Sequence, residues 1–351
     1  MSGVFVEQGE ALLRAGEYRA ARDFFAWAIG VEPDNWRAYA GRGLAWLGLG
    51  RLPVAMDDFD RAVALSDNPA GIYYNMGIGM AALGEPIEAE VAYGKAVMVA
   101  PRFFAAYFNR GILRLRQGKY EEARFDFDVL DHLQPGRAAT LFSRGIANAA
   151  LKRNEAAIAD FDAALEVNPA YPGVYAQRGR VRLAAGDHAG AVEDFSIALG
   201  PDPDNPELYL ARGIALLGAE RGREAVADLN RAVTLAGDRA EARLLRGRAL
   251  TAIRAYRTAI AEFEAAGELD RKSVEPPFFR GNALFDSGDY QGAVEAYTSA
   301  LGRDPAHPGA LLNRAAAQLR LDAIEESCRD WDVACARQIL AACGLWEKFC
   351  E

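Results

Sequence analysis

Two kinds of side chain in this sequence have types and spacings that suit chemistry: arginine–carboxylate pairs and a group of cysteines. In the stretch FNRGILRLRQGKYEEARFDF, Arg110 stands sixteen residues before Asp126. A guanidinium and a carboxylate form two parallel hydrogen bonds, which either hold a fold together or grip a charged ligand. The cysteines, which can form disulfides or bind metal, lie together near the C-terminus: Cys328, Cys335, Cys343 and Cys350.

Catalytic groupings are missing from the pattern. Each of the three histidines stands without a serine, cysteine or carboxylate at a spacing that would join a nucleophile and a base on one helical face. We therefore expect solvent-facing side chains at His132, His188 and His307. The sequence shows no glycine-rich phosphate loop and no CxxC zinc pair. It predicts no enzyme activity, no cofactor and no metal site.

The overall charge narrows the classes of partner. The 351 residues carry a formal net charge of -9. Nucleic-acid binding needs a basic surface, so nucleic acid is disfavoured, and acidic groups and anionic membranes are disfavoured for the same reason. No run of eighteen apolar residues occurs, and the N-terminus MSGVFVEQGEALLRAGEY lacks a basic stretch followed by a hydrophobic one. We expect neither a membrane span nor a signal peptide.

An internal repeat must position all of these residues. Glycine returns every 34 residues at Gly9, Gly43, Gly77, Gly111, Gly145, Gly179, Gly213, Gly247 and Gly281. An alanine follows each glycine by twelve residues, and a large residue, usually aromatic, follows the alanine by four, as in Ala123 and Phe127. A tenth unit keeps the phase with Ala315, Ser327 and Trp331. Such constant spacing is typical of a stacked repeat protein.

The spacing within each unit is helical. Apolar residues fall three and four apart on both sides of QGKY, where Gly118 provides a turn. A proline such as Pro101 or Pro135 ends the second half of the unit. Each unit is therefore predicted to be two helices, which approach closely where the glycine and the alanine lie.

On these small, small and large positions the chain resembles the tetratricopeptide repeat family. The resemblance implies an all-α solenoid of about ten helix-turn-helix repeats, stacked as a right-handed superhelix whose first helices line a concave groove. We predict one array over residues 2–341 and a capping helix over 342–351. The predicted units are 2–35, 36–69, 70–103, 104–137, 138–171, 172–205, 206–239, 240–273, 274–307 and 308–341.

The arginine and the acid occur together or are lost together in most units. Seven of the ten units have both, and the first and third have neither. Only the ninth unit has the arginine without the acid, with Arg280 opposite Ala296. Joint loss indicates an ion pair between the two helices of one unit, whereas a row of arginines binding a ligand would not require the acids.

The remaining first-helix residues are the candidate binding surface. The residues three before and one after the glycine lie one turn apart on one face. In the third to fifth units these positions and their polar neighbours are Tyr74, Asn75, Ile78, Phe108, Asn109, Ile112, Phe142, Ser143 and Ile146. In the family such positions commonly face the groove, which implies a site for an amphipathic helix or an extended peptide. Packing of the aromatic residues against the preceding unit is the alternative.

The predicted binding surface lacks the basic residues that some family members use. Some family members bind an acidic C-terminus through asparagines and basic residues, but the groove positions here that would carry the basic residues are Ala105, Ala139 and Ser143. A second apolar region is a pocket, an oligomer contact or core: Leu244, Leu245, Phe278, Phe279 and Phe285.

The C-terminal segment resembles the terminators of bacterial tetratricopeptide and Sel1-like arrays. The cysteines are separated by seven, eight and seven residues, so they point inward along a capping structure. In cysteine-rich Sel1-like proteins a pair spaced like Cys335 and Cys343 is bridged. Buried free thiols are the alternative. We predict a cytoplasmic protein, or an extracytoplasmic one if that bridge forms.

Together these features predict a non-catalytic scaffold that binds a protein or peptide in the concave groove. The alternative is an architectural subunit whose array is covered by other chains, or by copies of itself through the C-terminal units. The sequence does not identify the partner or the pathway.

Overall fold

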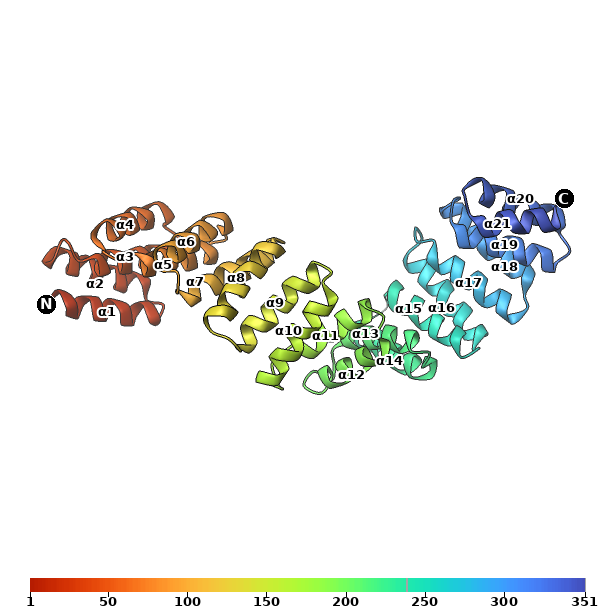
Figure 1. The fold of residues 1–351 in the computed structure, drawn as a ribbon, viewed down its shortest axis with the longest axis horizontal. Helices are drawn as coiled ribbons and strands as arrows, with labels where there is room; N and C mark the ends of the chain where they lie inside the picture. The colour runs from red at the N-terminus through yellow and green to blue at the C-terminus, as the bar shows by residue number, and fades with distance from the viewer. Residues whose placement is uncertain (238, 351) are drawn as a thin grey trace. The chain divides into compact units, whose positions relative to one another are not determined.

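The computed structural model describes residues 1–237 and 239–350, and these residues form helices without any strand. Consecutive helices pair side by side (Figure 1). The first helices of the pairs are α1 (Ser2–Arg14), α3 (Trp36–Gly48), α5 (Ala70–Ala82), α7 (Phe104–Arg116), α9 (Ala138–Ala150), α11 (Val174–Ala184), α13 (Pro206–Gly218), α15 (Ala240–Ala252), α17 (Glu275–Ser287) and α19 (Pro308–Arg320). The second helices are α2 (Tyr18–Val31), α4 (Leu52–Leu65), α6 (Pro86–Val99), α8 (Tyr120–Leu133), α10 (Asn154–Val167), α12 (His188–Ala198), α14 (Gly222–Ala236), α16 (Tyr256–Leu269), α18 (Tyr290–Arg303) and α20 (Ile324–Ala336). The final helix is α21 (Leu340–Phe349). The predicted all-α class is confirmed.

A left-handed backbone residue turns each chain segment from its first helix into its second. Gly118 adopts φ +75° between α7 and α8, a conformation that glycine reaches without a steric cost. Lys152 holds the same place between α9 and α10 with φ 59°. The turn therefore keeps its geometry even where the sequence lacks the glycine.

Close packing between the paired helices depends on the small and large residues of the repeat. A Cβ added at Gly111 would lie 2.8 Å from the Phe127 ring, so only glycine fits there. Phe127 and Ala123 are both fully buried. The same contact recurs along the chain, so a large side chain of the second helix, aromatic in most pairs and Leu229 in the seventh, fills the space that the glycine leaves.

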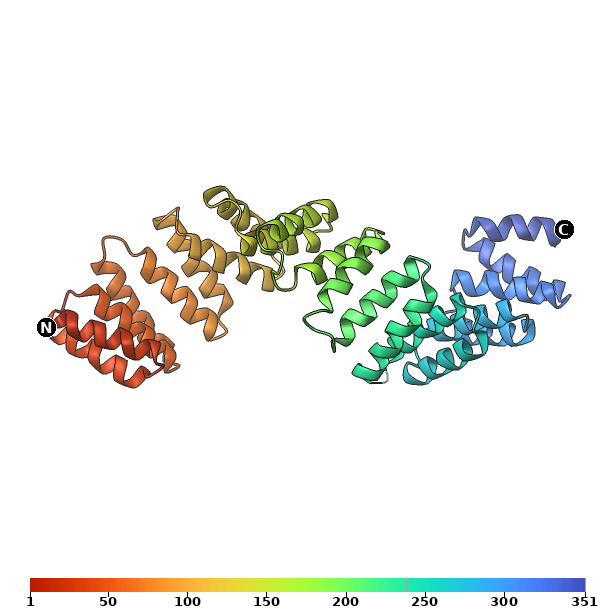
Figure 2. The same cartoon turned by 90° about the horizontal axis from the view of Figure 1, so that it is seen from below.

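The chain divides into two compact parts, Met1–Val174 and Tyr175 onward. Within each part, buried side chains form successive clusters along the helix pairs, such as the one around Phe59, Met76 and Tyr93 in the first part. The second view shows the same pairing of consecutive helices (Figure 2). The unit boundaries and the handedness of the superhelix stay predictions.

The predicted ion pairs between the helices of one unit are present. The arginine of the first helix lies 2.5–2.7 Å from the acid of the second in Arg42–Asp58, Arg110–Asp126, Arg144–Asp160, Arg178–Asp194, Arg212–Asp228, Arg246–Glu262 and Arg314–Asp330. Hydrogen bonding to Asp58 raises the pKa of Arg42. The repeating pair is therefore a structural element of the fold.

The fourth helix pair holds its acid most deeply. The Asp126 side chain is fully buried, and it accepts hydrogen bonds from Arg110 Nε and Nη2 and from Arg114 Nη1. In the ninth pair, by contrast, Arg280 bonds Glu264 of the preceding pair at 3.3 Å. Its buried Nε has no hydrogen-bond partner among the described residues. The missing acid at Ala296 thus leaves a buried donor unsatisfied.

The second apolar region of the sequence is packed within the second part. The Phe278 ring lies 5.3 Å from Phe279 and 6.1 Å from Tyr297, and Phe285 lies 5.2 Å from Tyr290. Leu245 is buried and Leu244 is half-buried. Leu245 belongs to the core, and the other four residues are half-buried beside it or beside neighbouring rings.

Two histidines differ from the solvent-facing prediction. His307 begins α19, where its Nδ1 accepts a hydrogen bond from the Ala310 N–H, and its ring lies 4.7 Å from Phe278. His188 packs beside Gly218 with a buried Nδ1. His132 is exposed as expected. Spacing alone could not show that the two histidines lie against the next helix pair or cap it.

The C-terminal helix is joined to the last pair by two disulfides. Cys335–Cys343 is the bridge that the Sel1-like resemblance implies, and Cys328–Cys350 is a second one. The Phe349 ring of α21 lies 5.7 Å from the buried Trp331. The helix begins at Leu340, two residues before the predicted cap. Within the described residues, no helix has the length and apolar character that crossing a membrane requires.

Candidate functional site

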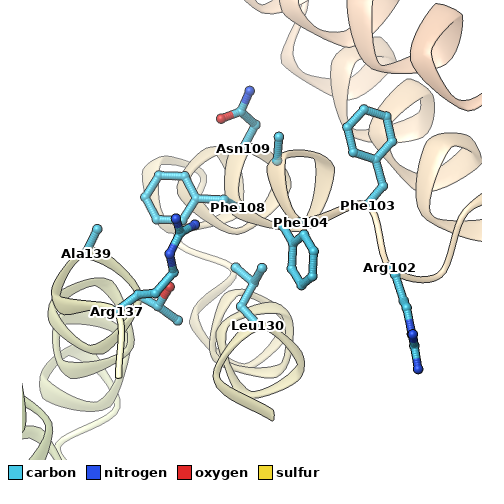
Figure 3. Close-up of a pocket in the computed structure, with 10 residues that line it drawn as sticks. Arg102, Phe103, Phe104, Phe108, Asn109, Leu130, Arg137 and Ala139 are labelled. Carbon is cyan, nitrogen blue, oxygen red and sulfur yellow. The ribbon is translucent and has the colours of Figure 1, made fainter. Parts of the chain in front are cut away.

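A cavity of about 490 Å³ opens between α7, α8 and the beginning of α9 (Figure 3). We call it the α7–α9 cavity. Its described lining residues are Arg102, Phe103, Phe104, Ala105, Phe108, Asn109, Leu130, Arg137, Ala139 and Thr140. Most of these side chains are apolar, so the cavity suits an apolar group.

Helices α7 and α8 supply the large apolar side chains of the cavity. Phe104 and Phe108 are one turn apart on α7, which places both rings on the same side of the helix. Leu130 reaches the cavity from α8 and is itself buried. The Phe108 ring packs 6.0 Å from Phe127 of the core, so it is held in place from behind.

Arg137 closes one side of the cavity without filling it. It is the residue just before α9, and its exposed side chain extends toward Phe108 (Figure 3). Its guanidinium forms no ion pair with another described residue. The cavity therefore combines an apolar floor with an unpaired positive charge at its rim.

The residue at the start of the following helix pair explains why this cavity is open. It stands eight residues before the glycine of that pair. The residue that follows the third pair is Phe103, whose ring lies 4.9 Å from Tyr74 of that pair. The residue that follows the fifth pair is Tyr171, whose ring lies 5.4 Å from Phe142 of that pair. These two rings pack on the aromatic residue of the preceding pair, whereas Phe108 has Arg137 at this place and lines the α7–α9 cavity.

Polar groups lie at the edge of the α7–α9 cavity. The Asn109 amide donates a hydrogen bond of 3.2 Å to the Tyr74 hydroxyl. Beneath Tyr74, burial raises the pKa of the Tyr93 hydroxyl, and the hydrogen bond with Asn109 opposes that rise. The Tyr93 hydroxyl is therefore neutral at physiological pH, and the Asn109 carbonyl oxygen can accept a hydrogen bond from a ligand.

The structure brings only part of the predicted surface together. Phe108 and Asn109 line the α7–α9 cavity, and Tyr74 is joined to it through Asn109. Asn75 lines a separate cavity of about 670 Å³ beside Trp36. Ile78 is 40% exposed and lines a third cavity, of about 430 Å³.

The other four predicted residues lie outside these cavities. Ile112 packs on the cluster around Phe127, and Phe142 is half-buried against Phe161 and Tyr171. Ile146 is half-buried. Ser143 differs most from the prediction, because it is 4% exposed and its hydroxyl donates to the Ala139 carbonyl of its own helix. It has no polar group to offer a ligand.

Sequence reasoning missed Phe104, Leu130 and Arg137. The predicted surface comprises positions three before, two before and one after the glycine, whereas Phe104 stands seven before it. The useful signal was present at the start of the next unit, where Arg137 stands in place of an aromatic residue. The described residues contain no group of His, Cys, Asp and Glu that could hold a metal ion.

Comparison with protein families gives one assignment over most of the chain. The model described as Tetratricopeptide repeat matches residues 6–69, 74–138, 142–206, 210–273 and 280–332. No curated protein matches the sequence significantly.

Several solved structures are similar to this chain. The C-terminal part of a repeat-containing protein from Cytophaga hutchinsonii is 17% identical with a TM-score of 0.56, over 68% of this chain and 98% of that one. A tetratricopeptide repeat protein from Parabacteroides merdae is 19% identical with a TM-score of 0.48, over 81% and 98%. YrrB, described as a repeat protein with an unusual peptide-binding site, is 24% identical with a TM-score of 0.46, over 53% and 95%.

Proposed function

Because the chain belongs to the tetratricopeptide repeat family, whose repeats generally mediate protein–protein interaction, we propose that it is a non-catalytic scaffold that binds a segment of a partner protein in the α7–α9 cavity. The observation that carries this proposal is the apolar lining of the cavity, where the half-buried rings of Phe104 and Phe108 meet Leu130, and where Arg137 stands in place of an aromatic residue. An apolar cavity with a few polar groups at its edge is the usual form of a binding site.

The geometry favours a partner segment with one large apolar anchor. The anchor fills the space over Phe104, Phe108 and Leu130, and its removal from water supplies most of the binding free energy. The Asn109 carbonyl oxygen accepts a hydrogen bond from the partner's backbone or side chain. Either an amphipathic helix or an extended peptide meets these requirements.

A peptide selection tests this proposal. Random peptides displayed on phage are selected on the wild-type protein, and the dissociation constants of the selected peptides are measured by fluorescence polarisation. We expect Phe108→Asp to weaken their binding at least about tenfold, because a carboxylate cannot be buried in the apolar cavity without a large cost.

Ile87→Asp is the matched control. Ile87 is 68% exposed on α6 and lies outside the described lining of the α7–α9 cavity, so the same change there should leave peptide binding unaltered. Circular dichroism melts establish that both variants are folded. Selected peptides that bind Phe108→Asp as tightly as wild type would exclude the cavity as the site.

The C-terminal disulfides support a second proposal, that the protein works in an oxidising compartment. Paired cysteines persist there and are rare in the reducing cytosol. Thiol labelling and mass spectrometry of protein taken from the source cell test it. We expect all four cysteines to resist labelling before reduction. Four labelled thiols would favour the cytoplasmic prediction instead.

A further inference from the structure

Acidic residues are distributed unevenly between the two helices of the second to fifth pairs; the first pair differs, because α1 carries Glu7 and Glu10. The first helices α3, α5, α7 and α9 contain no aspartate or glutamate. The second helices α4, α6, α8 and α10 each contain two or more. The net charge of -9 belongs to the whole chain, and it says little about the surface that α3, α5, α7 and α9 present.

Most arginines of these first helices are already neutralised. Arg42, Arg110 and Arg144 are held by the acids of their own pairs. Arg114 lies 2.8 Å from Glu90 and 2.9 Å from Asp126. These side chains cannot attract a ligand without giving up a buried partner, so they contribute structure rather than recognition.

A second set of arginines has no acidic partner among the described residues. Arg102 and Arg137 come from the segments that lead into α7 and α9, and both are exposed and line the α7–α9 cavity. No described lining residue of this cavity is acidic. The cavity beside Arg280 is different, because Glu264 and Glu268 line it together with the arginines.

From this distribution we infer that the partner segment is acidic, with carboxylates flanking the apolar anchor that enters the α7–α9 cavity. The inference rests on the proposed function of that cavity. A carboxylate placed beside the anchor pairs with the Arg137 guanidinium and gains a charge-assisted, bidentate hydrogen bond. A basic segment would place a like charge there, which the site rejects.

The whole-chain charge does not oppose this pairing. The Debye length is about 8 Å at physiological ionic strength, so acids on the far side of the helix pairs are largely screened from the cavity. The charge that a partner meets is therefore the local one, and it is positive. Chain-wide composition predicted the opposite preference, because it averages over both faces of the repeat.

Three synthetic peptides separate this inference from the proposed function. They have the same length and the same leucines at helical spacing, and their remaining positions are all glutamate, all glutamine or all lysine. Affinities are measured by fluorescence polarisation at low and high salt. We expect the glutamate peptide to bind at least about tenfold more tightly than the lysine peptide at low salt, with the difference shrinking at high salt.

Variants assign that preference to its residue. Arg137→Gln should remove most of the difference between the glutamate and lysine peptides while leaving the affinity of the glutamine peptide unchanged. Arg51→Gln, an exposed arginine outside the described lining of the cavity, is the control and should change none of the three affinities.

Each outcome decides one of the two claims. Equal binding of the three peptides, lost in Phe108→Asp, would overturn the acidic partner and leave the binding scaffold standing. Peptide binding that Phe108→Asp does not change, or no binding at all, would overturn the scaffold and the inference with it. An oligothymidine that displaces the glutamate peptide would overturn the inference by assigning the arginines to nucleic acid.

Discussion

Phe108 in the fourth helix pair and Phe278 in the ninth occupy the same place in the repeat, three residues before the glycine. Of the two, only Phe108 is among the lining residues of the cavities described above. Phe108 faces the space beside Arg137. Phe278 lies 4.7 Å from the ring of His307, which stands where Arg137 stands in the earlier pair. His307 also caps α19 through Nδ1.

The difference indicates that a residue of the following repeat unit decides whether the aromatic ring can contact a ligand. Phe103, Tyr171 and His307 all cover the ring before them. A charged residue at that place keeps its guanidinium in water and leaves the ring accessible. Function in this array is therefore expected where the covering residue is missing, rather than where aromatic residues are most frequent.

The largest expected loss of stability follows from breaking the Arg110–Asp126 ion pair in the fourth helix pair. Asp126→Ala leaves Arg110 without its acid and Arg114 with Glu90 alone, and it should lower the free energy of unfolding by about 3–5 kcal/mol. Urea denaturation measures the change. Adding Arg110→Met should recover part of the loss, because the unpaired charge is then gone. A single variant as stable as wild type would contradict the structural role.

The two phenylalanines should differ in their contribution to stability. We expect Phe278→Ala to cost about 2–3 kcal/mol and Phe108→Ala about 1 kcal/mol, because the loss on truncation scales with the contacts that surround the ring. Paired urea denaturation curves give both values. Equal losses would mean that Phe108 is covered as well, and the comparison between the two pairs would fail.

The ninth pair can be given the ion pair that it lacks. Ala296→Asp supplies an acceptor for the buried Nε of Arg280, and it should raise the free energy of unfolding by about 1 kcal/mol. The double variant Ala296→Asp with Arg280→Met is the control, since its new carboxylate is unpaired. A destabilised single variant would show that the position cannot accept the acid.

The smallest effect is expected at the turns. Lys152→Gly should raise the free energy of unfolding by about 0.5 kcal/mol, because glycine adopts the positive φ without strain. The gain is small because glycine also has a greater conformational entropy in the unfolded chain. Gly118→Ala, at the same place in the fourth pair, should destabilise. Thermal melts that change in the same direction for both variants would contradict this assignment of the turn.

The fold was readable from the sequence, because the glycine, alanine and aromatic positions each serve one contact that repeats. Arg110 and Asp126 could be paired by noticing that the two types are lost together. The site was only partly readable, since Phe108 and Tyr74 share one position in the repeat. Their different surroundings depend on Arg137 and Phe103 in the units that follow. Cys328–Cys350 could not be predicted either, because nothing in its spacing distinguishes it from other pairings.

The central claim is that the α7–α9 cavity binds the partner segment. A substitution that closes this cavity tests it most directly. Arg137→Tyr places at the start of α9 the residue type that covers Phe142 in the next pair. The dissociation constant of a phage-selected peptide is measured by fluorescence polarisation for wild type, Arg137→Tyr and the control Arg51→Tyr. The account predicts that Arg137→Tyr weakens binding at least about tenfold while Arg51→Tyr has no effect. Unchanged affinity for Arg137→Tyr, in a variant with a wild-type melting curve, would contradict it.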